Sequence, residues 1–124
     1  MNFIAMNGQG FRPRLNLNRD VVPINIDFDV AYWQFMKDAL FAVVNEEGGT
    51  AYNIFKSEKN SIWGKTSTAE TKTNYEAEEE MTVNSWFVGY VEKKDKIMTI
   101  CVLLEDVNQE DKKNSKEFAK ALFD

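Results

Sequence analysis

A lysine and three hydroxyl side chains stand next to one another at Lys65, Thr66, Ser67 and Thr68. They lie in the segment 61–68, which we predict to be a β-strand that carries a positive charge and a row of hydroxyl groups. A second segment, Ser-Trp-Phe-Val-Gly-Tyr at residues 85–90, is rich in the aromatic and β-branched residues that favour strands. We expect the two segments to pair as antiparallel neighbours.

Composition excludes several kinds of chemistry. The chain contains no histidine, so a histidine-based catalytic triad and a histidine-ligated metal are both excluded. A group of glutamates at positions 76 and 78–80 lies in a polar segment that we interpret as a solvated loop rather than a cation site. We predict no metal and no cofactor. The single cysteine, Cys101, rules out an internal disulfide and is predicted to be a small buried hydrophobic residue.

Length and charge bound the remaining possibilities. A chain of 124 residues favours one domain spanning residues 1–124. The formal net charge of −5 argues against nucleic acid and against an anionic membrane surface as partners. No apolar run approaches the roughly 20 residues that a membrane span needs. Residues 1–10 do not have the pattern of a signal peptide, so we expect no targeting signal in this chain.

The elements that position the lysine strand can be predicted from periodicity and capping. Asp29 is a suitable N-cap for a helix with apolar residues at helical spacing, and Gly48-Gly49 would end that helix. Residues 97–104 are almost entirely apolar and are predicted to form a third strand, buried on both faces. A last helix over residues 116–123 would bury Phe118, Ala119 and Leu122.

The expected fold class is therefore α+β: an α/β layer in which a three-stranded antiparallel meander is flanked by helices that share one face of the sheet. Trp33 on the long helix is expected to pack against that sheet. Towards the N-terminus we predict a glycine turn over residues 8–11 and a weak edge strand within residues 15–22.

These segments, in this order, resemble the C-terminal part of the transpeptidase domain of class B penicillin-binding proteins, and most closely the elongation type. Gly-Lys-Thr-Ser-Thr-Ala-Glu at residues 64–70 is similar to the family's Lys-Thr-Gly strand. Gly-Gln-Gly at residues 8–10, Pro-Arg-Leu at 13–15, Val-Val-Asn at 43–45 and Gly-Gly-Thr-Ala at 48–51 also resemble family segments. Each match is short, and the signal lies in their order over most of the chain.

The resemblance implies a partial penicillin-binding or serine β-lactamase-like fold and a role in peptidoglycan cross-linking. It implies that Lys65 and Thr66 bind the carboxylate of a peptidoglycan stem peptide or a β-lactam. Ser67 would occupy the third position of the motif, and the backbone N–H of Thr68 would supply half of the oxyanion hole. The parent protein would act in the periplasm or on the extracytoplasmic face of the cell membrane, in cell-wall synthesis.

Two departures from the family pattern concern the chemistry. Ser67 stands where the family usually has glycine, and a glycine lets a ligand lie close to the strand backbone. Family enzymes attack with the serine of Ser-x-x-Lys and use a second Ser-x-Asn motif. Neither pattern occurs here, because the residues three positions after the serines are Asn60, Gly64, Glu70, Val88 and Phe118. The nucleophile is not within these residues, so we expect no catalytic residue and an inactive isolated chain.

Three interpretations follow. The chain is the C-terminal fragment of a D,D-transpeptidase domain and forms one wall of the penicillin-binding cleft; or it is a non-catalytic binding or interaction module that keeps the transpeptidase sheet; or it is an unrelated α/β domain with a chance Lys-Thr-Ser. In addition, the strand at residues 97–104 is interior in the family but lacks its usual neighbours here. We predict that this strand edge mediates self-association.

Overall fold

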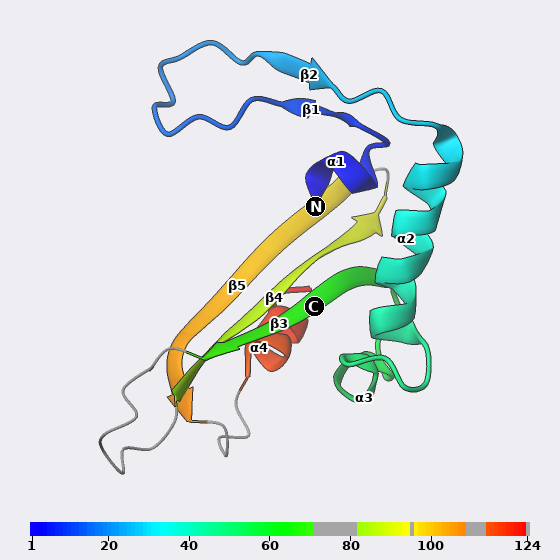
Figure 1. The fold of residues 1–124 in the computed structure, drawn as a ribbon, viewed down its shortest axis with the longest axis vertical. Helices are drawn as coiled ribbons and strands as arrows, with labels where there is room; N and C mark the ends of the chain where they lie inside the picture. The colour runs from blue at the N-terminus through cyan, green and yellow to red at the C-terminus, as the bar shows by residue number, and fades with distance from the viewer. Residues whose placement is uncertain (71–81, 95, 109–113, 124) are drawn as a thin grey trace.

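The computed structural model describes residues 1–70, 82–94, 96–108 and 114–123. The predicted glutamate loop therefore lies outside the described residues. The described elements follow one another in the order α1 (Asn2–Ala5), β1 (Gln9–Phe11), β2 (Pro23–Asn25), α2 (Val30–Asn45), α3 (Tyr52–Phe55), β3 (Ile62–Glu70), β4 (Thr82–Lys93), β5 (Lys96–Asn108) and α4 (Ser115–Phe123). Figure 1 shows the long sheet with α2 at one end and α4 against one face.

The main sheet has the order β3-β4-β5, and both strand pairs are antiparallel. This confirms the predicted meander and the α+β fold class. Lys65 lies opposite Val88 and Ser67 lies opposite Trp86, so the lysine strand and the aromatic strand are neighbours as expected. The middle position belongs to β4, so β3 and β5 are the outer strands of the sheet among the described residues.

Helix α2 begins and ends where capping predicts. The Asp29 Oδ1 atom accepts a hydrogen bond of 2.8 Å from the Ala31 backbone N–H, which satisfies one of the free donors of the first turn. The helix ends at Asn45, and Gly48 then adopts φ +92°. Glycine adopts this conformation readily because it has no Cβ atom, whereas other residues rarely do. The strong cap and the glycine stop are local signals, which is why they could be read directly from the sequence.

The two halves of α2 have different neighbours. Trp33 is buried, but its ring stacks at a tilt on Phe28, with centroids 5.3 Å apart, and a Cβ on Gly8 would lie 2.8 Å from it. The sheet is instead contacted further along the helix, where Phe41 pairs with Trp63 at 5.8 Å and Val44 enters the core. The prediction that Trp33 packs against the sheet is corrected accordingly, because that end of α2 lies beside the N-terminal segment (Figure 1).

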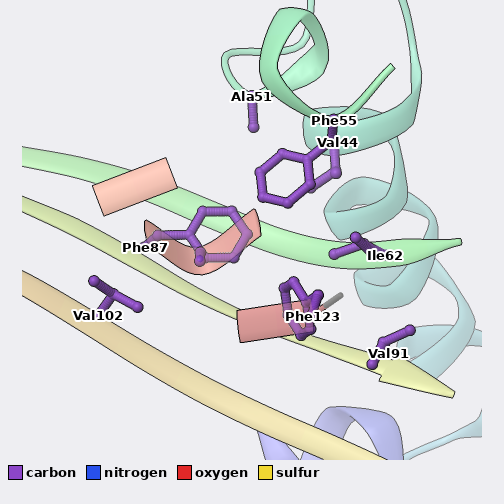
Figure 2. Close-up of a cluster of buried hydrophobic side chains, with 9 residues drawn as sticks. Val44, Ala51, Phe55, Ile62, Phe87, Val91, Val102 and Phe123 are labelled. Atoms are coloured by element: carbon purple, nitrogen blue, oxygen red, sulfur yellow. The ribbon is translucent and has the colours of Figure 1, made fainter. Parts of the chain in front are cut away.

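One apolar cluster joins both long helices to the same face of the sheet, as predicted. Phe87 on β4 is its centre: its ring lies 5.3 Å from that of Phe55 and 6.3 Å from that of Phe123 (Figure 2). The buried members of the cluster are Val44, Ala51, Phe55, Ile62, Phe87, Val91, Val102, Ala119 and Phe123. These residues come from α2, α3, the three strands and α4, so the cluster ties the whole layer together.

The buried stripe of α4 differs from the predicted one. Ser115, Ala119 and Phe123 are buried, whereas Phe118 and Leu122 are 47% and 59% exposed. Both sets have helical spacing, so periodicity alone could not choose between them. Two contacts accompany the observed rotation. The Ser115 Oγ atom lies 2.9 Å from the Ser85 Oγ atom on β4. Phe123 on the same side of the helix packs against Phe55 and Phe87, so this side faces the sheet.

The prediction that the apolar third strand is buried on both faces is wrong. In β5 only Val102 is buried, and Cys101, predicted to be a buried residue, is exposed. Side chains alternate across a strand, so Val102 points to the helix-covered face and Cys101 to the other. The apolar composition of a strand shows that its side chains could be buried. Whether they are buried depends on whether another element covers that face of the sheet.

The N-terminal segment forms a small hairpin rather than a turn and a weak strand. Strands β1 and β2 pair through Gln9–Asn25, Gly10–Ile24 and Phe11–Pro23. The predicted weak strand at residues 15–22 lies instead in the connection between them. Pro23 is the first residue of β2, a strand position that tolerates its missing N–H. Leu15 and Leu17 are exposed in that connection, so their apolar spacing does not reflect a packed face.

Tyr90 carries an unusual buried hydroxyl group on the sheet face opposite the main core. Its ring stacks on Trp63 with centroids 5.0 Å apart and planes 2° apart, and the residue is fully buried. The hydroxyl oxygen has no hydrogen-bond partner among the described residues. Burial, with a smaller contribution from the Glu92 charge, raises the pKa of Tyr90 to about 12. A buried phenol without a partner costs free energy and resists ionisation.

Replacing Tyr90 with Phe is expected to preserve or raise stability near neutral pH, because it removes an unsatisfied polar atom. In the native chain, the phenol of Tyr90 ionises near pH 10 when the protein is unfolded, but it stays protonated up to about pH 12 when the protein is folded. The contribution of Tyr90 to the free energy of unfolding is therefore fully present below pH 10. It is lost as the pH rises through 12, by an amount on the order of 2 kcal/mol. Urea denaturation of the native chain and of the Tyr90→Phe variant at pH 8 and pH 11 measures this loss. An equal loss of stability in the two proteins would contradict the raised pKa of Tyr90.

Candidate carboxylate-binding strand

The four predicted site residues all lie on β3, at the open edge of the main sheet. Lys65 and Ser67 point to one face, because their cross-strand partners are Val88 and Trp86. Thr66 and Thr68 point to the helix-covered face, opposite Phe87 and Ser85. Thr66 is half-buried. Lys65, Ser67 and Thr68 are exposed to solvent along this edge.

Thr66 is held in place by a residue that sequence reasoning did not assign to the site. The Thr50 Oγ1 atom lies 2.7 Å from the Thr66 Oγ1 atom, within a hydrogen bond. The backbone carbonyl of Thr50 accepts a long hydrogen bond of 3.4 Å from the Lys116 Nζ atom on α4. The available signal was the Gly-Gly-Thr-Ala segment, which shares its order with the family but carries no obvious chemistry. Thr50 thus orients the hydroxyl group of Thr66.

Lys65 is close to the strand backbone. Its Nζ atom donates a 2.5 Å hydrogen bond to the backbone carbonyl of Thr66. A lysine ammonium group has three N–H donors, so two remain for another acceptor at this edge. A carboxylate beside β3 could accept a charge-assisted hydrogen bond from the ammonium group of Lys65 on one face of the sheet, whereas the hydroxyl group of Thr66 lies towards the other face. Such charge-assisted hydrogen bonds are about twice as strong as neutral ones.

The start of β3 is positioned by packing and by one amide. The Asn45 Nδ2 atom donates hydrogen bonds of 2.9 Å to the Phe41 carbonyl and 2.7 Å to the Ile62 carbonyl, which joins the end of α2 to the strand. Gly64 leaves room for the core: a Cβ there would lie 2.5 Å from the ring of Phe87. The glycine before the lysine is thus required by packing, and the site residues follow directly after it.

A serine and a lysine do meet elsewhere in the fold, between α3 and α4. The Lys120 Nζ atom donates to the Ser57 Oγ atom at 2.9 Å, but it also donates to the Ile54 carbonyl and forms an ion pair with Glu58, both at 3.1 Å. These three acceptors match the three donors of an ammonium group. Lys120 therefore tethers α4 to the residues around α3, and it is not placed as a base that takes a proton from Ser57.

A search against protein-family models gives one match that covers almost the whole chain. The model is that of the penicillin binding protein transpeptidase domain, and it matches residues 3–124. The chain belongs to this transpeptidase family. The family match therefore excludes the interpretation as an unrelated domain with a chance Lys-Thr-Ser. A search of curated proteins with this chain gives no match.

Membership of the penicillin-binding transpeptidase family connects the fold to peptidoglycan cross-linking, and the family's enzymes are extracellular or periplasmic. The three-stranded sheet and its helices agree with a partial transpeptidase fold. Among the described residues, no helix combines the length and apolar character of a membrane span. The same part of the chain contains no group of three or more potential histidine, cysteine or carboxylate metal ligands.

Proposed function

We propose that residues 1–124 are the C-terminal portion of a D,D-transpeptidase domain of a class B penicillin-binding protein, of the elongation type. In this proposal β3 supplies the Lys-Thr wall of the penicillin-binding cleft, and the nucleophile is not among these residues. The parent protein would act on the extracytoplasmic side of the cell membrane. The observation that carries the proposal is the family match over residues 3–124, with Lys65 and a Thr66 hydroxyl group held by Thr50 both placed on the edge strand β3.

The proposed roles come from the resemblance of residues 64–70 to the family's Lys-Thr-Gly strand. The ammonium group of Lys65 and the hydroxyl group of Thr66 bind the carboxylate of a stem peptide or a β-lactam. Thr50 fixes the rotamer of Thr66 through the 2.7 Å contact between their hydroxyl oxygens. The backbone N–H of Thr68 contributes to the oxyanion hole. Ser67 adds a Cβ and a hydroxyl group where the family has glycine, and it narrows the approach of a ligand to the strand backbone.

A second candidate is a non-catalytic binding module derived from the same fold. One sequence observation favours it: Ser67 stands where the family usually has glycine. Both candidates use the same carboxylate-binding strand, and they differ in whether chemistry follows binding. Finding Ser-x-x-Lys encoded upstream in the parent gene would favour the transpeptidase fragment.

Binding to β3 can be tested by adding a peptide that ends in D-alanyl-D-alanine to the 15N-labelled chain. We expect amide shift changes centred on residues 65–68. Replacing Lys65 with Gln is expected to weaken binding about tenfold or more, because it removes one charge-assisted hydrogen bond.

Two controls make the binding experiment specific. Lys59 is exposed in a connecting loop, so Lys59→Gln removes one positive charge without touching β3 and should leave the affinity unchanged. The same peptide with a C-terminal amide lacks the carboxylate and should bind weakly. Equal effects of the two lysine variants would mean that net charge, and not the strand site, determines binding.

The partner part of the proposal is self-association. We also propose that the chain associates with a second copy through the edge at residues 97–104, since the outer side of β5 has no strand neighbour among the described residues. Unpaired N–H and C=O groups on a strand edge are a template for another strand.

A further inference from the structure

We infer that Thr50 is a positioning residue of the carboxylate site: its hydroxyl group donates to Thr66 and leaves the proton of Thr66 for the ligand. This role rests on the proposed function, in which Thr66 binds a carboxylate. It also gives the Gly-Gly-Thr-Ala segment at residues 48–51 a part in ligand selection. The two hydroxyl oxygens lie 2.7 Å apart, although the residues are sixteen positions apart in the chain.

The segment that carries Thr50 is packed tightly against the last turn of α2. The Ala51 N–H donates a 3.0 Å hydrogen bond to the Val43 carbonyl, and the Ala51 side chain is buried in the main core. A Cβ on Gly49 would lie 2.5 Å from the carbonyl oxygens of Ala42 and Val43, so a side chain there would push the segment away from the helix. The residues on both sides of Thr50 therefore hold its backbone in place.

A second anchor for Thr50 comes from α4. The Lys116 Nζ atom donates a hydrogen bond of 3.4 Å to the Thr50 carbonyl. This contact uses the backbone of Thr50 and leaves its hydroxyl group available for Thr66. Each of these contacts lies within the chain, so the position of Thr50 does not depend on an exposed strand edge.

The chemistry of a carboxylate decides the direction of the hydrogen bond between the two threonines. A hydroxyl group has one proton to donate, and an ionised carboxylate only accepts. A Thr66 hydroxyl group that binds a carboxylate therefore gives its proton to the ligand. The 2.7 Å contact then requires Thr50 to donate and Thr66 to accept. Among the described residues, the Thr66 hydroxyl group has no other hydrogen-bond partner that would compete for its proton.

Thr50 thereby favours ionised ligands over neutral ones. A hydrogen bond to a charged acceptor is about twice as strong as one to a neutral acceptor. An oriented Thr66 donor is therefore worth more to a ligand carboxylate than to the carbonyl group of a carboxamide. Without the Thr50 hydroxyl group, the Thr66 side chain can change its χ1 rotamer, and part of that preference is lost.

Two matched variants test the role of the Thr50 hydroxyl group. Thr50→Val keeps the branched shape of the side chain without the hydroxyl group, whereas Thr50→Ser keeps the hydroxyl group. In the ligand-free chain, three-bond NMR couplings to the methyl carbon of Thr66 report its χ1 rotamer. We expect a single rotamer in the native chain and in Thr50→Ser, and averaged couplings in Thr50→Val.

Peptide affinity then tests the selectivity. For the peptide that ends in D-alanyl-D-alanine, Thr50→Val should weaken binding about fivefold, and Thr50→Ser should stay within about twofold of the native chain. For the same peptide with a C-terminal amide, Thr50→Val should weaken binding less than about twofold. Thr99→Val makes the same change at an exposed threonine of β5 and should alter neither affinity.

Three results would overturn the role of Thr50: unchanged Thr66 couplings in Thr50→Val, equal weakening of the acid and the amide, or no recovery in Thr50→Ser. A native chain that does not bind the acid peptide would instead contradict the proposed function. The couplings are measured without ligand, so they would still decide whether Thr50 holds Thr66.

Discussion

Incubated with a fluorescent penicillin and run on a denaturing gel, the 124-residue chain is expected to give no labelled band. A covalent acyl-enzyme needs a serine whose proton is taken by an adjacent base. No serine of this chain has a lysine three residues later. Where a serine and a lysine do meet, at Ser57 and Lys120, the ammonium group is shared with Glu58 and a backbone carbonyl.

The expected effect is complete, because the acylation step itself is missing rather than slowed. An intact penicillin-binding transpeptidase labelled in parallel shows that the probe is reactive. A Ser57→Ala variant serves as the specific control for the Ser57–Lys120 contact. A labelled band in the native chain that disappears in this variant would show that the contact is catalytic and that our interpretation of Lys120 is wrong.

The second large effect concerns the core. Replacing Phe87 with Ala is expected to lower the free energy of unfolding by about 3–5 kcal/mol, the range for removing a large buried aromatic side chain. Phe87 is 0% exposed and its ring contacts those of Phe55 and Phe123. Gly64 and Gly89 also leave space for this ring, so truncating it opens a cavity that the backbone cannot easily fill. Urea denaturation followed by tryptophan fluorescence measures the change.

Phe118 offers a matched control, because it is the same residue type on the exposed side of α4. Phe118→Ala should cost less than about 1 kcal/mol, since little of its apolar surface is removed from water. The sequence alone predicts the opposite burial for this residue. A large loss of stability for Phe118→Ala together with a small loss for Phe87→Ala would mean that the rotation of α4 is assigned wrongly.

Much of the fold could be predicted because its signals are local. Asp29 caps α2 and Gly48 allows its end, whatever the remainder of the chain does. The aromatic segment at residues 85–90 and the lysine segment before it have the composition of strands, and their antiparallel pairing is confirmed. The family resemblance also rests on local motifs in a fixed order, and the family match confirms it at the level of the transpeptidase domain.

The residue types of the candidate site could be predicted from the sequence. The residues elsewhere in the chain that hold them in place could not. Lys65 and Thr66 follow from the motif, but Thr50 is sixteen positions away from Thr66 and meets it only in the folded chain. The contact between Ser57 and Lys120 is likewise invisible to a search for Ser-x-x-Lys, which examines only neighbouring positions. Contacts between distant segments depend on how the helices sit on the sheet, and periodicity does not encode that.

By itself, the sequence determined α2 with its start and stop, α4, the three strands of the main sheet, and which of these strands carries the lysine and hydroxyl groups. It did not predict the β1–β2 hairpin. Only the tertiary structure decided which apolar side chains are buried. Phe118, Leu122 and Cys101 are apolar enough for a core but are exposed, because a side chain is buried only where another layer covers it. On α4 the buried side is the one that carries the Ser115 contact with Ser85 and the packing of Phe123 against Phe55 and Phe87, both of which join segments far apart in the sequence.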